Sequence, residues 1–395
     1  MTQPPKPIPV AEAQARLFAL AVPLPAETVP TYAANGRYLA APLNAARTQP
    51  AADLSAMDGY AVRADDLAGP WRVAGESAAG HPFDRALTAG EAVRISTGAL
   101  IPDGGGAVLL QEEAARDGDR LTTSGGAPTP RHIRRAGFDF RECDALLAAG
   151  ERLNPGRIAL ALSGGHGSLS IGRLPTLAVL DSGDELSVDP AACAPHQIPA
   201  SNGVMLAAMA APFAGSVRRI GPVGDTMAAL QAALEQAEGC DVLVTSGGAS
   251  VGDHDLVRPA LEAWGAKIDF WRVAMRPGKP LMVARRGDQM VLGLPGNPVS
   301  GYVTAFLFLL PLLRHLAGAS EPLPAPLSMR LAGDMPVCGD RTEFARGRME
   351  DGKVVPFGQQ DSSALASLGA ADCLIRRDAG ARPAKAGEMV PVFPL

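Results

Sequence analysis

The chain has 395 residues, a length that predicts two to four domains. Its hydrophobic share of 47% and charged share of 19% are typical of a soluble globular protein. The formal net charge of −5 counts against a nucleic-acid-binding surface, because affinity for the phosphate backbone comes from clustered lysine and arginine. The 44 glycines and 35 prolines are spread along the chain, which favours turn-rich β structure over a disordered tract.

Cysteine usage and the N-terminal sequence point to a reducing compartment. The five cysteines lie at least 35 residues apart and show no zinc-ligand spacing, so we expect reduced thiols. The first residues are rich in proline and make a poor signal peptide. The most apolar run, Tyr302 to Leu313, is about a dozen residues long and contains Pro311, which makes it too short to cross a bilayer. We therefore expect a cytoplasmic protein that binds neither membrane nor nucleic acid.

The predicted secondary structure changes twice in the first half of the chain. Helical periodicity over Val10 to Ala21 predicts an N-terminal helix, which Thr31 to Leu43 can continue. From about residue 45 to 139, short apolar pieces alternate with glycine- and proline-rich turns, which predicts a small β domain. Asp144 to Leu162 returns to helical character, with Asn154-Pro155 as the expected helix start.

From about residue 172 onward, strands and helices alternate, which predicts a parallel sheet with helices on both faces. The expected strands are 176–180, 217–220, 242–245 and 289–294. One helix is expected to begin after Ser201, and three more are expected over 226–237, 253–264 and 299–316. A proline-rich linker at 321–327 then leads to short strand-like pieces over 328–395, which predict a small C-terminal β domain.

Three of these strands end in loops rich in glycine and polar residues. Ser246-Gly247-Gly248 follows the run Val242 to Val244, Asp181 to Glu185 follows strand 176–180, and Gly293 to Pro298 contains four helix-breaking residues. Ligands of open α/β sheets bind at this edge, where backbone N–H groups meet anions. A tight turn without a ligand would account for Ser-Gly-Gly alone, but three such loops together favour a binding site.

Acidic and basic residues gather in the same region. For each acidic residue, helix N-capping is an alternative role, but all of them lie in loops at one edge of the predicted sheet. That placement favours binding of Mg²⁺, which uses one or two carboxylates together with substrate phosphates. The acidic residues are Asp184, Glu185, Asp225, Asp253 and Asp255. The segment 270–280 carries Arg272, Arg276 and Lys279 with no acid among them, which favours anion binding over a solvated face. These patterns predict a protein that binds an anionic, phosphorylated ligand with a divalent cation.

The remaining candidates are weaker patterns by themselves. Asp58-Gly59, within Ser55 to Val62, is also a strong hairpin-turn signal. Asp139 ends the run that begins at Arg134, and it again lies close to a glycine. The runs 341–348 and 361–363 offer guanidinium and hydroxyl donors, but alone they are typical of a surface.

Six motifs in chain order resemble those of the MoeA family of molybdopterin molybdenumtransferases, to which the E domain of gephyrin is related. The motifs are Ser55–Val62, Ser96–Gly98, Ser182–Leu186, Ser246–Gly252, Arg276–Pro280 and Gly293–Ser300. The resemblance covers nearly the whole chain and implies a multidomain fold of α/β plus β type. Its implied parts are a helical, elongated dimerisation domain (1–44 with 140–172), an inserted β domain (45–139), a molybdopterin-binding α/β domain with a central parallel sheet (173–320) and a C-terminal β barrel (321–395).

The same resemblance implies an enzyme that inserts molybdenum. It would cleave adenylylated molybdopterin in a Mg²⁺-dependent step, release AMP and leave molybdenum from molybdate on the dithiolene. Implied partners are a second copy of the chain, which shares the cleft, the upstream molybdopterin adenylyltransferase and acceptor molybdoenzymes. Two alternatives are the adenylyltransferase itself, which shares two of the loops but does not need the flanking domains, and a non-catalytic molybdopterin-binding carrier or scaffold, which would not need the acidic set.

Residue by residue, the resemblance implies the following site. Catalytic acids are Asp58, Asp139, Glu185 and Asp225, and metal ligands are Glu185, Asp225 and Asp255. Ligand-binding positions are Thr97, Ser182, Gly183, Ser246, Gly247, Gly248, Arg272, Arg276, Lys279, Pro295, Gly296, Asn297, Arg346 and either or both of Ser362 and Ser363. The sequence departs from the family pattern at Gly106, Cys143 and Ser182, and it has Arg272 and Arg276 where lysine is common. Arginine keeps the charge of lysine but changes the geometry.

Overall fold

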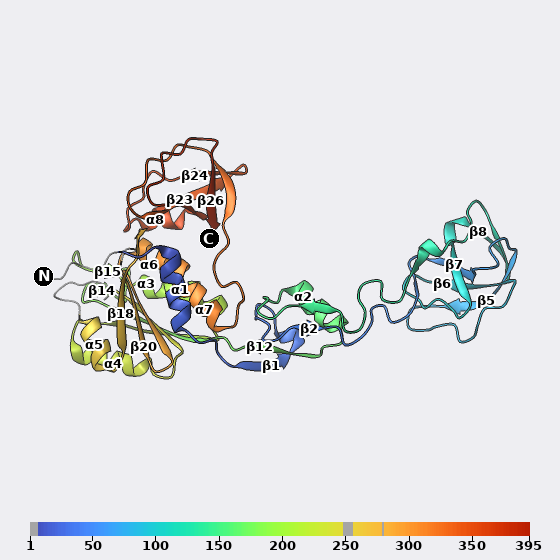
Figure 1. The fold of residues 1–395 in the computed structure, drawn as a ribbon, viewed down its shortest axis with the longest axis horizontal. Helices are drawn as coiled ribbons and strands as arrows, with labels where there is room; N and C mark the ends of the chain where they lie inside the picture. Colours follow the sequence, from blue (N-terminus) through green and yellow to red (C-terminus); the bar gives the residue numbers. More distant parts are fainter. Residues whose placement is uncertain (1–6, 248–255, 279) are drawn as a thin grey trace.

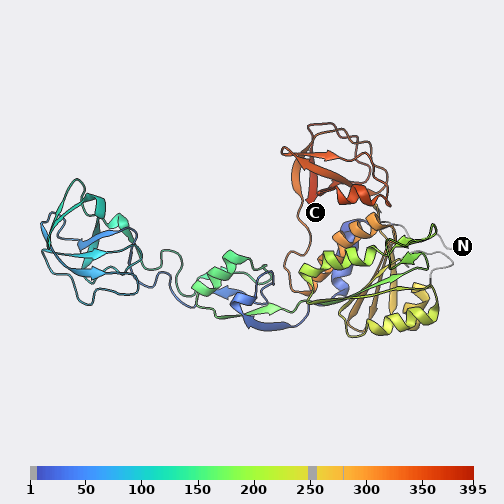
Figure 2. The same ribbon diagram turned by 180° about the vertical axis from the view of Figure 1, so that it is seen from behind.

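The computed structural model describes residues 7–247, 256–278 and 280–395, so the predicted site residues Gly248, Asp255 and Lys279 lie outside the described residues. The molecule is elongated (Figure 1). An inserted β domain lies at one end and an α/β domain at the other, with a narrow elongated domain between them. The C-terminal domain packs beside the α/β domain, and the view from behind gives the same arrangement (Figure 2).

The α/β domain is built on a six-stranded sheet of order β16-β13-β17-β21-β20-β18. The first four of these strands are parallel, as predicted, whereas β20 runs antiparallel to both of its neighbours. The sequence pattern missed β18 and β20 because no helix separates either from the next strand, and Gly287 makes the tight turn into β21 with a φ of +60°. The strands are β13 (Thr176–Ser182), β16 (Ser216–Val223), β17 (Val242–Ser246), β18 (Lys267–Arg272), β20 (Pro280–Arg286) and β21 (Gln289–Leu294). Two short strands, β14 (Leu186–Ser187) and β15 (Ile198–Pro199), pair beside the sheet.

Helices cover both faces of this sheet because successive residues of a buried strand point to opposite sides. Val244 and Leu292 face one core together with α1 (Val10–Leu20), α3 (Asn202–Ala210) and the helix that starts at Pro298. Leu243 and Val291 face the other core with α4 (Met227–Gln236) and α5 (Val257–Ala263). The predicted N-terminal helix thus exists, but it packs on the α/β domain, and Gln14 Nε2 donates to the Leu307 carbonyl at 2.9 Å.

The longest apolar helix is part of this core. It consists of α6 (Pro298–Thr304), the π-helical turn η5 (Ala305–Leu309) and α7 (Leu310–Leu316). These 19 residues are long and apolar enough to cross a membrane by length and composition, but 83% of the most apolar window is buried in the structure. The helix is therefore longer than the apolar run in the sequence, and its side chains fill the interior of the α/β domain.

The elongated domain, residues 26–44 and 140–172, is a ladder of short strands with one helix. Strand β1 (Ala26–Pro30) pairs with β12 (Ser168–Gly172), and β2 (Leu43–Asn44) pairs with β11 (Ala145–Leu147). Helix α2 (Pro155–Ser163) begins as predicted, since Asn154 Oδ1 accepts from the Arg157 N–H at 2.9 Å. The expected helix over 31–43 is wrong. Only a 3₁₀ turn, η1 (Thr31–Ala33), forms there, because Gly36 adopts a φ of +80° and the following residues pair with the second segment.

The inserted β domain contains a six-stranded sheet of order β7-β4-β6-β5-β9-β8, and the short apolar pieces that begin at Tyr60, Trp71, Ala92 and Ala107 lie in its strands. Gly59 begins strand β4 and does not form a hairpin turn. A Cβ on Gly59 would lie 2.0 Å from the Leu109 carbonyl oxygen, so glycine is required by the close approach of β7. The strands are β4 (Gly59–Arg63), β5 (Trp71–Ser77), β6 (Glu91–Ile95), β7 (Gly105–Leu110), β8 (Ala114–Asp117) and β9 (Arg120–Thr123), with β3 (Leu54–Ser55) pairing with β10 (Ile133–Arg134) at the side.

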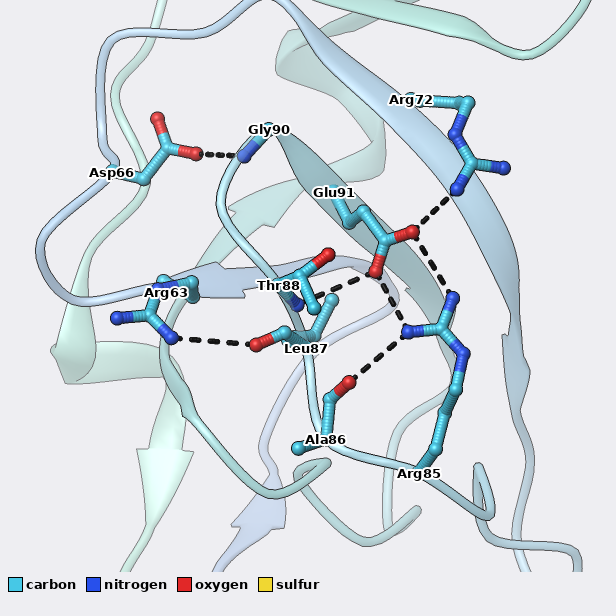
Figure 3. A network of polar contacts seen from close by, with 9 residues as sticks. All are labelled: Arg63, Asp66, Arg72, Arg85, Ala86, Leu87, Thr88, Gly90 and Glu91. Atoms are coloured by element: carbon cyan, nitrogen blue, oxygen red, sulfur yellow. Dashed lines mark hydrogen bonds and ion pairs between the residues drawn. The ribbon is translucent and has the colours of Figure 1, made fainter.

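A buried glutamate anchors one end of this domain (Figure 3). Glu91 is 6% exposed, and Arg85 donates two hydrogen bonds to its carboxylate at 2.8 and 3.0 Å. Arg72 adds a third contact, and the Thr88 N–H donates at 3.3 Å. These donors hold the pKa of Glu91 at about 2, so the carboxylate is charged at neutral pH and ties β5 and β6 to the 85–88 loop.

The C-terminal domain is a closed five-stranded barrel, as predicted. Its strands are β22 (Leu327–Leu331), β23 (Thr342–Glu350), β24 (Lys353–Pro356), β25 (Cys373–Arg377) and β26 (Met389–Pro394), and one short helix, α8 (Leu365–Gly369), precedes β25. The two-residue strand β19 (Met275–Arg276) leaves the α/β domain and pairs with β23. This pairing joins the barrel to the α/β domain.

Candidate functional site

A pocket of about 680 Å³, called the main pocket below, opens between the α/β domain and the C-terminal barrel. It lies at the carboxyl ends of the parallel strands, the edge at which ligands of open α/β sheets bind. The described residues that line it come from several chain segments of the two domains. They are Glu185, Ile198, Arg276, Pro277, Gly278, Pro280, Pro295, Gly296, Asn297, Ser300, Arg341 and 360–362. Two domains thus contribute polar and charged groups to a single hollow.

The loop after β21 brings a helix start into the main pocket. Pro298 occupies the first helical position, and Asn202 Nδ2 fixes the preceding turn by donating to the Gly296 carbonyl at 2.7 Å. Asn297 Nδ2 donates to Ser362 Oγ at 3.1 Å, and the Val299 N–H donates to the Ser362 carbonyl at 3.1 Å. The amino end of a helix favours an anion, so this predicted loop has the properties expected of an oxyanion site.

Arginines face the pocket from both domains. Arg276 lies on β19, and its side chain is 61% exposed although it makes an ion pair with Glu343 at 3.5 Å. Arg341 lines the pocket just before β23, where its Nε lies 3.9 Å from the fully exposed Asp340 carboxylate. Both guanidiniums therefore keep donors free for a ligand, as a planar fork that matches a tetrahedral oxyanion.

Arg346 is placed differently from Arg276 and Arg341. Its side chain is buried at 1% exposure, and its guanidinium donates to the carbonyls of Gln359 and Asp361 at 3.0 Å and of Ala364 at 3.4 Å. Burial lowers the pKa of Arg346. The structure thus gives Arg346 the task of holding the 359–364 loop, and a direct oxyanion contact stays a sequence-based prediction.

The two neighbouring serines of this loop separate in space. Ser362 lines the main pocket. Ser363 instead bonds to Asp361 Oδ1 through its hydroxyl at 2.6 Å and its N–H at 2.9 Å, which lowers the pKa of Asp361. Of the two, Ser362 is therefore the one with its hydroxyl placed among the pocket groups.

The acidic loops lie at adjacent strand ends. Glu185 lines the main pocket, and its carboxylate lies over Gly183, where a Cβ would come within 2.5 Å of Oε2. Asp184 Oδ1 accepts from the Asp225 N–H at 3.0 Å, which links the loops after β13 and β16. Among the described residues, no group of three or more acidic, histidine or cysteine side chains forms a complete metal site. The donor set fits a cation such as Mg²⁺ that takes one or two carboxylates and completes its shell with substrate phosphate and water.

Further predicted residues lie behind the pocket wall. Gly247 has a φ of +97°, its N–H donates to the Leu294 carbonyl at 3.0 Å, and it lies against Gly296. The loop after β17 and the loop after β21 are therefore in contact. Ser246 is buried, Ser182 ends β13, and Arg272 ends β18. The structure places none of these three side chains in the lining of the main pocket.

Asp58, directly before β4, and Thr97, after β6, belong to the inserted β domain, which lies at the opposite end of the molecule from the α/β domain that carries the main pocket (Figure 1). Asp58 Oδ1 accepts from the Thr97 N–H at 2.6 Å and from its hydroxyl at 3.0 Å, and both bonds hold the pKa of Asp58 below its ordinary value. Asp139 is exposed in the segment that returns to the elongated domain. These predicted catalytic acids are not brought together with Glu185 and Asp225 within one chain.

The sequence reasoning missed several lining residues. Ser300 and Gln360 line the pocket without having been selected, and Arg341 had been noted only within the run 341–348 as a weak pattern. Ser300 lies in the first turn of the predicted helix after the Pro-Gly-Asn-Pro loop, so its position relative to that loop was a usable signal. Arg341 and Gln360 belong to the barrel, and only the docking of that domain places them.

Three family models match successive parts of this chain. They are described as the MoeA N-terminal region (domain I and II) over residues 8–165, a probable molybdopterin binding domain over 178–315 and the MoeA C-terminal region (domain IV) over 328–395. The chain belongs to the MoeA family. The resemblance and the fold class predicted from the six motifs are thereby confirmed.

Individual MoeA relatives match along nearly the full length. The molybdopterin molybdenumtransferase of Staphylococcus aureus (strain Mu50 / ATCC 700699) is 31% identical over 98% of this chain and 95% of its own length. That of Haemophilus influenzae is 34% identical over 88% of each chain. Among solved structures, the molybdopterin biosynthesis MoeA protein of Pyrococcus horikoshii OT3 superposes with a TM-score of 0.84 at 26% identity, covering 99% of this chain and 100% of its own. The similarity therefore extends over all the domains.

Proposed function

We propose that this protein is a molybdopterin molybdenumtransferase, which inserts molybdenum from molybdate into adenylylated molybdopterin and releases AMP. The observation that carries the proposal is the main pocket. Arg276, Ser362 and the helix start after Asn297 converge there from two domains. Relatives with this name also match the chain along nearly their whole length. An enzyme of this class is a transferase of molybdenum cofactor biosynthesis.

The pocket groups suit both substrates of the reaction. Molybdate is a tetrahedral dianion, and the guanidiniums of Arg276 and Arg341, the Ser362 hydroxyl and the Ser300 N–H in the first turn of α6 can each donate to one of its oxygens. Insertion forms two bonds between molybdenum and the dithiolene sulfurs, and one molybdate oxygen leaves as water with the two protons of the thiols. Hydrolysis breaks the phosphoanhydride between molybdopterin and AMP, with water supplying the new oxygen.

We propose that Glu185 and Asp225 hold Mg²⁺, with Asp255 as a further ligand from outside the described residues. The bound cation would neutralise charge on the phosphoanhydride. Independently of the cation, the Asp184 contact to the Asp225 N–H keeps the loops after β13 and β16 together, so that Asp225 stays near Glu185, which lines the main pocket. This arrangement orients the adenylate phosphates toward Arg276.

We also propose that the working unit is a homodimer in which Asp58, with Thr97, reaches the main pocket of the partner. The elongated shape supports this, because the inserted β domain, which carries Asp58, and the α/β domain, which carries most of the main pocket, lie at opposite ends of one chain (Figure 2). Exposed Asp58 is already held in one orientation by Thr97, as expected for a group that acts on a ligand bound elsewhere. Cytoplasmic location, delivery by the upstream adenylyltransferase and transfer to acceptor molybdoenzymes complete the proposal.

The decisive experiment measures AMP release from adenylylated molybdopterin by the purified protein with Mg²⁺, with and without molybdate. We expect molybdate-dependent release and a product that activates a cofactor-free molybdoenzyme. Binding of the adenylate without cleavage would support a carrier instead, and synthesis of the adenylate from ATP and molybdopterin would identify the upstream adenylyltransferase.

A further inference from the structure

A second hollow, called the joint pocket below, lies where the elongated domain meets the α/β domain. Its volume is about 590 Å³, and Tyr38, Arg152 and Arg157 line it from the elongated domain, while Arg314 lines it from α7. Tyr38 and Arg152 are direct partners in an antiparallel bridge. Ser320, in the linker after α7, closes the joint by donating to the Gly150 carbonyl through its N–H at 3.1 Å and its hydroxyl at 3.2 Å.

The contact at the joint is tight and specific. Gly150 has a φ of +78°, and a Cβ there would lie 2.6 Å from the Ser320 nitrogen. The backbone contact between Gly150 and Ser320 therefore fixes the distance between the two sides of the joint pocket, and it keeps the side chains on those two sides close together. The joint pocket therefore lies at a domain boundary whose backbone geometry is fixed.

The charges in the joint pocket do not balance. Arg157 is paired with Glu151 at 2.8 Å. In the part of the chain that the structure describes, neither Arg152 nor Arg314 has an ion pair, although Glu321 also lines the pocket. Arg152 Nε donates to the Gly36 carbonyl at 3.2 Å, and Arg314 Nη1 donates to the Pro322 carbonyl at 3.4 Å. These contacts leave most of the guanidinium donors of both residues unused.

The two unpaired arginines are also held close together. Both lie over the ring of Phe213, with Cζ at 5.5 Å from the ring centroid for Arg152 and 4.4 Å for Arg314. Burial of Arg314, together with its nearness to Arg152, lowers the pKa of Arg314. Like charges gathered in a half-buried site repel each other, and an anion between them removes that repulsion.

We infer that the joint pocket binds a tetrahedral oxyanion between Arg152 and Arg314, with the Tyr38 hydroxyl as a further donor. The ligand class is a free dianion of the phosphate, sulfate or molybdate kind, or the phosphate group of a nucleotide such as AMP. Guanidinium forks from two sides match such an anion. The joint pocket is separate from the main pocket, because Ser300 and Arg314 lie on one continuous helix and are about 20 Å apart by its rise per residue.

Binding there has a mechanical consequence. Arg152 belongs to the elongated domain and Arg314 to the α/β domain, so one ligand contacts both sides of the joint. The ligand thus adds a contact between the two domains beside the hydrogen bonds of Ser320 to Gly150.

The test measures anion binding by isothermal titration calorimetry at constant ionic strength, with inorganic phosphate, molybdate and AMP as separate probes. The protein carries Arg276→Met, so that binding at the main pocket is suppressed. We expect saturable binding of one equivalent per chain, at least tenfold weaker after Arg152→Met and after Arg314→Met. Glu321→Gln should tighten binding, because it removes a negative charge from the pocket. The matched control, Arg116→Met on the inserted β domain, should leave binding unchanged.

The relative affinities for AMP and inorganic phosphate distinguish a nucleotide ligand from a free oxyanion. Equal binding of AMP and phosphate identifies a free oxyanion as the ligand, and AMP binding at least tenfold tighter identifies a nucleotide phosphate. Absence of saturable binding, or binding that persists in both Arg152→Met and Arg314→Met, would overturn the inference. Arg152 is exposed, so its variant folds even where the Arg314 variant does not, and circular dichroism of each variant checks this.

Discussion

Asn297 and Ser362 join two domains at the main pocket through a hydrogen bond of 3.1 Å from the amide nitrogen to the hydroxyl. Asn297 ends the loop before α6, and Ser362 belongs to a loop of the C-terminal barrel. The Ser362 carbonyl accepts from the Val299 N–H as well, so one residue of the barrel contacts both the glycine loop and the helix start. The oxyanion site thus depends on how the barrel docks.

The first prediction separates the two neighbouring serines. Ser362→Ala removes a hydroxyl from the main pocket, so we expect the molybdate concentration for half-maximal AMP release to rise about tenfold, the loss of one good hydrogen bond to an anion. Ser363→Ala is the matched control, because its hydroxyl bonds to Asp361 and should leave the molybdate dependence within about twofold. The reverse ranking would show that Ser363 contacts the oxyanion.

The second prediction concerns Arg346. Arg346→Met removes the buried guanidinium that donates to three carbonyls of the 359–364 loop, so we expect the free energy of unfolding to fall by about 3 kcal/mol. Arg346→Lys should recover only part of this, since one ammonium group cannot reproduce the fork. Chemical denaturation measures both values. A variant of full stability that needs more molybdate would instead place Arg346 in direct contact with the anion.

The third prediction tests whether the site is shared between chains. Asp58→Ala and Arg276→Ala should each abolish AMP release while leaving the fold intact, because both side chains are exposed. If Asp58 acts on the partner, a mixed dimer has one intact site. Unfolding and refolding an equal mixture should then restore about a quarter of the wild-type activity by random pairing. If Asp58 serves its own chain, the mixture stays inactive.

The fourth prediction is a pH dependence of stability. The folded-state pKa of Glu91 is about 2 against an ordinary value of 4.5, so its contribution is present above pH 4.5 and is lost as the pH falls toward 2. Scanning calorimetry of the wild type and Glu91→Gln should therefore show melting temperatures that differ most at pH 7, lie closer together at pH 3 and converge only near pH 2. Exposed Glu112, changed to Gln, serves as the control and should give a constant difference. A gap that does not narrow would exclude the charge of Glu91 as the cause.

The sequence by itself determined the local features, because they depend on residues close together in the chain. The buried run Val242 to Val244, the glycine loop after it and the helix start at Pro298 all follow from periodicity, capping and backbone freedom. The six motifs in order also identified the family. The same reasoning failed over 31–43, where pairing with a segment more than a hundred residues away replaced the expected helix.

Only the tertiary structure decided which of these residues meet. Two strands that no helix separates from the next strand, β18 and β20, complete the sheet, and β19 carries Arg276 to the barrel, where Arg341 and Ser362 complete the main pocket. Burial turned Arg346 into a support for its loop, and the elongated shape separated Asp58 from Glu185. Contacts between distant segments depend on how the domains pack, and the local pattern of residues has no information about that packing.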